Sequence, residues 1–138
     1  MEFLNFSISK KLKEKGYREL CLAYYTNDDT LYYNYSHKAG ANYKDCYLSH
    51  NLMPKDSVSG KFIDAPTISQ ILKWLREEKK IHLIVEIADS GWYYTLYPNF
   101  RWENCKLKSD TYIMSFNHKE SFEQAALAGI EYVLDNLI

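Results

Sequence analysis

Apolar residues recur at helical spacing in three stretches of the chain. In the first stretch, Ile8 and Leu12 mark the apolar stripe of a helix, and Ser7 or Ser9 can cap that helix. Gly16 follows as a glycine that can end a helix in the left-handed conformation. These positions predict a short helix near the start of the chain.

The other two helical stretches carry clearer start signals. Each opens with a capping box, Thr67 to Gln70 in one and Ser121 to Gln124 in the other, in which two side chains satisfy free N–H groups of the first turn. Apolar residues follow the first box at i, i+3, i+4 and i+7, and a wide apolar face follows the second. The first helix should end in the charged run Arg76 to Lys80, and the second should run to the last residue.

Strand-like runs fill much of the remaining sequence. Leu20 to Thr26 and Thr30 to Tyr35 flank Asn27-Asp28-Asp29, a turn signal that predicts a hairpin. Three more strands are predicted after the second helix, at Ile81 to Ala88, Trp92 to Tyr97 and Thr111 to Phe116. In the first of these three, Ile81, Leu83, Val85 and Ile87 should face one way and His82, Ile84 and Glu86 the other.

The pattern predicts one α+β domain over residues 1–138, in the order αββ, loop, αβββα. Residues 1–35 form the αββ part, 36–65 an irregular loop with a short strand near Asp45 to Leu48, and 66–138 the αβββα part. We expect a mainly antiparallel sheet of about five strands with the helices packed chiefly on one face. The predicted core comprises Leu12, Leu20, Leu22, Ile68, Ile71, Leu72, Leu75, Leu83, Val85, Ile113, Phe122, Ala126, Ile130, Val133 and Leu134.

Composition narrows the classes of function. Apolar residues make up 46% of the chain, enough for a core, and 17 basic residues face 18 acidic ones, so the basic excess of most nucleic-acid-binding proteins is absent. No apolar run approaches the 20 or so residues that a membrane span needs. The first residues lack a signal-peptide pattern, and we expect a cytoplasmic protein whose three cysteines are free thiols.

The motifs of common catalytic and metal sites are incomplete. Gly60-Lys61 has Lys55 where a phosphate-binding loop needs glycine. The best zinc candidate, Cys46-x-x-x-His50 with His37 and Asp45 nearby, lacks the paired cysteine spacing of a zinc site. We therefore predict no metal, no cofactor and no catalytic residues.

One pair of residues, a histidine and a glutamate, has the chemistry of an acid–base pair. His82 and Glu86 share a face of one predicted strand, but four strand residues separate side chains by about 13 Å, too far for a direct hydrogen bond. A solvated sheet edge or a core histidine is the simpler interpretation of these residues.

Tyrosine is the outlier of the composition, with 13 residues. Each hydroxyl needs a partner or water, so many of these rings should be partly exposed, and rigid amphipathic rings are enriched in protein interfaces. Many of these tyrosines lie in the predicted strands. The candidate interface residues are Tyr32, Tyr33, Tyr35, Trp92, Tyr94 and Tyr97.

Three segments also resemble a known family. They are Leu12 to Tyr17 with Glu19-Leu20-Cys21 and Tyr24-Tyr25; Ala65-Pro66-Thr67 with Gln70 and Lys73 to Glu77; and Phe122 to Ala125 with Ala128 to Glu131. Together they resemble an uncharacterised family of small phage, prophage and mobile-element proteins of gut anaerobic bacteria. The resemblance implies a bacterial or phage setting and no particular activity.

These observations favour a non-enzymatic accessory protein that binds an unknown protein partner or itself. The first alternative is a nucleic-acid-binding module, because the αβββα order of residues 66–138 is that of the double-stranded-RNA-binding domain. That family grips phosphates with lysines that open the last helix. Here Glu120 and Glu123 accompany His118 and Lys119, and Glu131 and Asp135 follow in a helix without lysine, which makes nucleic acid the weaker interpretation. A small enzyme with the long loop as its lid is a distant third.

Overall fold

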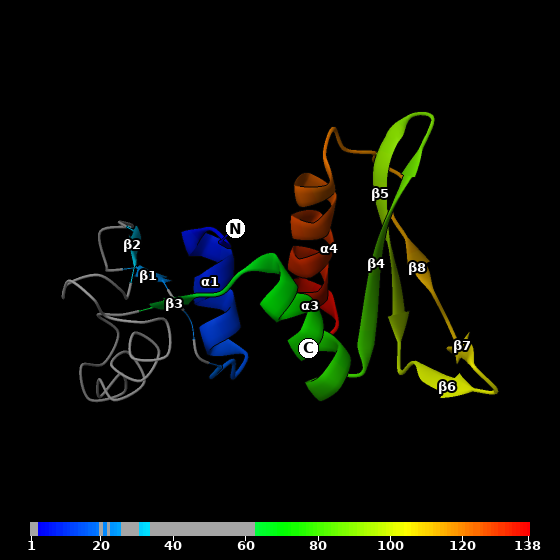
Figure 1. Ribbon diagram of the computed structural model, residues 1–138, viewed down its shortest axis with the longest axis horizontal. Helices are drawn as coiled ribbons and strands as arrows, with labels where there is room; N and C mark the ends of the chain where they lie inside the picture. The colour runs from blue at the N-terminus through cyan, green and yellow to red at the C-terminus, as the bar shows by residue number, and fades with distance from the viewer. Residues whose placement is uncertain (1–2, 20, 22, 26–30, 34–62) are drawn as a thin grey trace, which may run out of the picture. The chain divides into compact units, whose positions relative to one another are not determined.

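A computed structural model describes residues 3–19, 21, 23–25, 31–33 and 63–138 (Figure 1). The chain divides into two compact units, residues 1–67 and residues 68–138. The described residues combine helices with antiparallel strands in small sheets, so the predicted α+β class is confirmed. The organisation as a single domain stays a prediction.

The first unit packs one helix against a small antiparallel sheet. Its elements are α1 (Phe6–Glu14), β1 (Ala23–Tyr25), β2 (Leu31–Tyr33) and β3 (Ile63–Ala65). The sheet order is β2-β1-β3, so the predicted pairing of the first two strands is confirmed. β3 occupies the end of the segment that the sequence assigned to a loop, and the strand predicted near Asp45 to Leu48 lies outside the described residues.

The start of α1 differs from the sequence prediction. Asn5 is the N-cap, and its side-chain oxygen accepts a hydrogen bond of 2.9 Å from the backbone N–H of Ile8. Ser7 therefore lies inside the helix, and Ser9 is buried. The helix ends as predicted, with Gly16 at a φ of 91°, a value that favours glycine.

The core of the first unit joins the sheet to the segment before α1. It contains Ala23, Tyr25, Ile63 and Ala65, with Phe3, Phe6 and Leu31 packed against it. The Tyr25 hydroxyl donates a hydrogen bond of 2.9 Å to the backbone oxygen of Leu4. Tyr25 is thus a core residue whose hydroxyl is satisfied internally.

The second unit is built on an antiparallel sheet with two helices on one side (Figure 1). Its elements are α3 (Ile68–Glu78), β4 (Ile81–Ala88), β5 (Gly91–Pro98), β6 (Arg101–Glu103), β7 (Lys106–Lys108), β8 (Ile113–Met114) and α4 (Phe122–Asn136). The sheet order is β4-β5-β8, and β6 and β7 form a separate hairpin between β5 and β8. The predicted αβββα order is present, with this hairpin inserted.

Local signals in the sequence explain both helices of the second unit. The Ser121 side chain accepts a hydrogen bond of 3.2 Å from the Gln124 N–H, and the Gln124 side chain accepts one of 3.2 Å from the Glu120 N–H. At the other helix, Lys80 adopts a φ of 57° and turns the chain directly into β4. The capping box predicted for α4 is confirmed, with the second bond displaced by one residue.

Most of the predicted core is confirmed. The buried members are Leu12, Ile68, Ile71, Leu75, Leu83, Ala126, Ile130, Val133 and Leu134. Leu72, Val85 and Ile113 are partly buried, and Leu20 and Leu22 lie outside the residues whose side chains are described. Phe122 was wrongly assigned to the core: it is exposed at the start of α4, against the edge of the Trp92 ring.

Of the helices that the structure describes, none is long and apolar enough to cross a membrane.

Candidate functional site

The two faces of the β4–β5–β8 sheet differ in what covers them. A Cβ atom at Gly129 of α4 would meet Leu83 Cδ1 at 2.7 Å and Tyr94 Cγ at 3.0 Å, so those two side chains face the helices. Alternate residues of a strand point to opposite faces, and cross-strand partners share a face. The side that faces away from the helices, here called the open face, therefore carries His82, Ile84, Glu86, Tyr93, Thr95, Tyr97 and Met114.

Thr95 lies at the centre of the open face. Its cross-strand neighbours are Ile84 and Met114, and Tyr93 and Tyr97 lie beside it along its own strand. Thr95 is only 2% exposed, although α3 and α4 lie on the other side of the sheet. The surrounding side chains must therefore pack closely enough to bury it.

Three residues of the open face, His82, Tyr93 and Tyr97, contact aromatic rings from neighbouring segments. The Tyr97 ring lies 6.4 Å from Tyr112, and the Tyr93 ring 5.4 Å from His118, between ring centroids. His82 contacts two rings from the segment after β5, Phe100 at 5.3 Å and Trp102 at 6.5 Å. Tyr112 and Trp102 are 66% and 61% exposed, so this aromatic surface is accessible to a partner.

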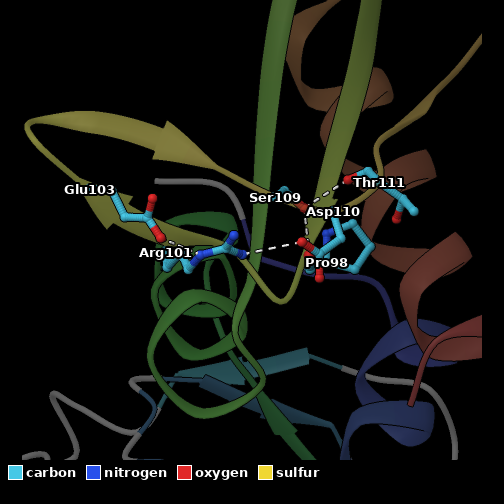
Figure 2. A network of polar contacts seen from close by, with 6 residues as sticks. All are labelled: Pro98, Arg101, Glu103, Ser109, Asp110 and Thr111. Carbon is cyan, nitrogen blue, oxygen red and sulfur yellow. Dashed lines mark hydrogen bonds and ion pairs between the residues drawn. The ribbon is translucent and has the colours of Figure 1, made fainter.

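A network of polar contacts fixes the hairpin that carries Trp102 (Figure 2). The Arg101 guanidinium lies 2.7 Å from the Glu103 carboxylate and 3.4 Å from the Asp110 carboxylate. The Ser109 hydroxyl lies 2.6 Å from the backbone oxygen of Pro98 and 2.7 Å from that of Thr111, so its one proton is shared between two acceptors. These contacts tie both ends of the β6–β7 hairpin to the end of β5.

Two titratable groups on the open face are shifted from their usual behaviour. Burial lowers the pKa of the His82 imidazole, and the Arg76 charge lowers it further. Desolvation raises the pKa of Tyr93, and so does the Glu86 carboxylate, which accepts a hydrogen bond of 3.3 Å from the Tyr93 hydroxyl. Both shifts favour the neutral side chain, so these two rings contribute no charge to the open face near neutral pH.

The candidate interface residues lie in different environments. Trp92 and Tyr94 face α4, with ring centroids 6.0 Å from Phe122 and 6.5 Å from Tyr132. Tyr97 lies on the open face. Tyr32 and Tyr33 belong to β2, while Tyr35 lies outside the described residues.

Other exposed apolar residues of the second unit were not singled out from the sequence. Trp102, Tyr112, Met114 and Phe116 are exposed on or beside the open face. Strand alternation could have grouped Tyr112, Met114 and Phe116, because all three occupy even positions of one predicted strand. Trp102 carries no such signal, because it lies between Tyr97 and Thr111, where the sequence predicts no strand.

A metal-binding arrangement finds no support in the described residues, whereas the Ser90 hydroxyl contacts His118 Nδ1 beside the Tyr93 ring. Within them, no three His, Cys, Asp or Glu side chains are grouped so as to hold a metal ion. The zinc candidate around Cys46 and His50 lies outside this part of the chain. The arrangement that remains is a surface of aromatic rings suited to contact with another molecule.

Comparisons of the chain with protein-family models, with curated proteins and with solved structures found no match.

Proposed function

We propose that the chain is a non-enzymatic accessory protein that binds another protein through the open face of the β4–β5–β8 sheet. The observation that carries this proposal is the set of exposed apolar side chains on and beside that face: Phe116 at 91%, Tyr112 at 66%, Trp102 at 61% and Met114 at 41%. The resemblance to phage and mobile-element proteins supports a partner of bacterial or phage origin.

The chemistry of the open face favours a protein partner. Aromatic rings and methionine are enriched at protein interfaces, because they bury a large area at little cost in conformational entropy. The net charge of −1 also leaves little long-range repulsion against another protein.

Nucleic acid remains the second candidate because aromatic rings on an open sheet can stack on bases, and because the αβββα order is present. The charges argue against it. Glu86 lies on the open face, Arg101 is paired with two carboxylates, and Glu123 occupies the first turn of α4. Phosphate groups would meet acidic residues at these positions.

The proposal is tested by removing two neighbouring rings, Tyr97 and Tyr112, from the open face and its border. A photoreactive residue at position 112 would first crosslink and identify the partner in a bacterial host. The double variant Tyr97→Ala with Tyr112→Ala should then weaken binding of the purified partner by about thirtyfold, the effect of losing roughly 2 kcal/mol from an aromatic anchor. Isothermal titration calorimetry would measure the affinity, and circular dichroism the fold.

Phe122→Ala is the matched control, because it removes an exposed ring from the start of α4 and leaves the open face intact. A folded double variant that binds as tightly as the wild type would refute the proposal. Gel-shift titrations with single-stranded and duplex RNA test the alternative. A shift that the double variant loses would assign the open face to nucleic acid instead.

A further inference from the structure

Strand β4 forms one edge of the β4–β5–β8 sheet. The hydrogen bonds that β5 makes show which backbone groups of β4 do not pair with β5. The Trp92 N–H donates to Lys119 and the Trp92 oxygen accepts from Lys119, at 2.8 and 2.7 Å. The Tyr94 oxygen accepts from the Ser115 N–H at 3.0 Å. Trp92 and Tyr94 therefore direct their backbone groups away from β4.

The β4 residues opposite Trp92 and Tyr94 must therefore direct their backbone N–H and C=O groups away from β5, toward the outer edge of β4. Ile87 stands opposite Trp92 and Val85 opposite Tyr94, so both are non-hydrogen-bonded pairs of the antiparallel ladder. Alternation extends the same orientation to Leu83 and Ile81. Pro98, opposite Ile81, agrees with this, because proline has no N–H to donate.

The outer edge of β4 thus offers the N–H and C=O groups of four alternate residues. In the sheet of residues 68–138, β5 is the strand that pairs with β4, and none lies on its other side. An edge of this length is a template for a further strand. At the hairpin end of this edge, Ile87 is 65% exposed.

We infer that β4 pairs antiparallel with β4 of a second copy of the chain, across a two-fold axis at Ile84. This register sets Ile84 opposite Ile84 of the second copy, and His82 opposite Glu86. Leu83 then meets Val85, and Ile81 meets the exposed Ile87. The outward backbone groups of both strands fall opposite one another as hydrogen-bonded pairs.

The sequence of β4 is self-complementary in this register. An isologous contact requires each residue to suit its symmetry partner. Between residues 81 and 87 each apolar residue meets an apolar residue, and the Glu86 carboxylate meets the imidazole of His82, whose N–H can donate a hydrogen bond to it. Moving the axis to Val85 would set Glu86 opposite Ile84, and moving it to Leu83 would set Ile87 opposite Lys79, beyond the strand.

The inference goes beyond the proposed function, since it concerns the edge of the sheet and a second copy rather than the open face and a foreign protein. Pairing would join two sheets into one and place two open faces side by side. A partner with two matching sites would then bind with increased avidity.

The test places like charges on the two-fold axis. Ile84 is partly exposed, so Ile84→Lys should fold and set two lysines opposite each other. Sedimentation velocity of the full chain should show a dimer for the wild type and a dissociation constant at least about tenfold weaker for Ile84→Lys. Met114→Lys is the matched control, because it adds the same charge on the open face away from β4, and it should dimerise as the wild type does.

A charge-reversal experiment then tests the axis itself. Ile84→Lys and Ile84→Glu should each be monomeric, whereas an equimolar mixture should form a heterodimer. A monomeric wild type, a dimer unaffected by Ile84→Lys, equal weakening by Met114→Lys, or a mixture that stays monomeric would each overturn the inference. If circular dichroism shows that Ile84→Lys is unfolded, Ile87→Lys at the exposed end replaces it. The Tyr97 and Tyr112 double variant should still dimerise, which separates this site from the proposed function.

Discussion

At the scale of single residues, His82 has the least satisfied side chain of the open face. Its ring packs against Phe100 and Trp102, and its Nδ1 atom is buried without a hydrogen-bond partner among the described residues. An unsatisfied buried polar atom typically costs about 1–3 kcal/mol. His82 therefore reduces the stability of the fold in return for its ring contacts.

We expect His82→Phe to stabilise the protein by roughly 1 kcal/mol at pH 7.5, because it keeps the ring contacts and removes the unsatisfied nitrogen. The pKa of His82 is lowered in the fold, so the unfolded chain binds the proton more tightly. Protonation of His82 therefore does not lower the free energy of unfolding above pH about 6.5. It lowers that free energy increasingly as the pH falls below this value. Urea unfolding at several pH values, at low protein concentration, measures both effects.

His82→Gln separates the two effects, since glutamine does not titrate but still buries a polar group. It should lose the part of the pH dependence that His82 supplies, without the gain in stability. If His82→Phe destabilises the protein at pH 7.5, the imidazole has a favourable interaction that the geometry does not show.

The sequence predicted the positions of the aromatic residues but not their faces. Tyr93 and Tyr94 point in opposite directions, since they are neighbours on a strand. The pattern could not tell which of them meets a helix, because tyrosine suits a core and a surface equally. The close approach of Gly129 to Tyr94 resolves the choice, and it depends on contacts between distant parts of the chain.

At the scale of elements, local signals predicted the helices well and the short strands poorly. The capping boxes predicted where α3 and α4 begin, and the alternation of apolar residues predicted β4. The β6–β7 hairpin was missed because its turn is Asn104-Cys105, with φ values of 52° and 60°. Such turns usually carry glycine second, and a cysteine hides the signal.

Strand β3 was missed for a different reason. Its three residues are too few to show alternation, and its partner β1 is far away in the sequence. Pairing between distant segments leaves no local pattern to detect. The small sheet of the first unit was therefore only half predictable.

The packing of α4 on the sheet depends on Gly129. An added Cβ would lie 2.7 Å from Leu83 Cδ1 and 3.0 Å from Tyr94 Cγ, so the helix or those side chains would have to move. We expect Gly129→Ala to destabilise the protein by about 1–3 kcal/mol from overpacking, against a gain of about 1 kcal/mol in helix propensity. Thermal unfolding would measure the net loss.

Leu83→Val in the Gly129→Ala background provides the control, because the shorter side chain makes room for the new methyl group. It should recover part of the lost stability. A Gly129→Ala variant as stable as the wild type would show that α4 adjusts its position at no cost.

At the scale of the whole molecule, the chain divides into two compact units, each with buried apolar residues of its own. Tyr25, Ile63 and Ala65 belong to the first, whereas Leu83 and Ile130 belong to the second. The sequence predicts a single domain because the chain has the usual length of one, and this stays a prediction.

We expect residues 66–138 to fold without the rest of the chain. The fragment keeps the capping box predicted from Thr67 to Gln70, both helices on the sheet, and every strand of the sheet. A fragment of roughly 70 residues lies near the lower limit for an independent core, so we expect a cooperative transition at only a few kcal/mol. Circular dichroism and urea unfolding measure this.

The same fragment with Ala126→Asp is the control for a native core. Ala126 is fully buried on α4, and an uncompensated charge there should cost several kcal/mol, enough to unfold so small a domain. Cooperative unfolding that disappears in this variant would show that the fragment has the packing of the second unit. A fragment that is unfolded even without the substitution would mean that its helices and sheet depend on residues 1–65, and that the single domain predicted from the sequence is the correct description of the chain.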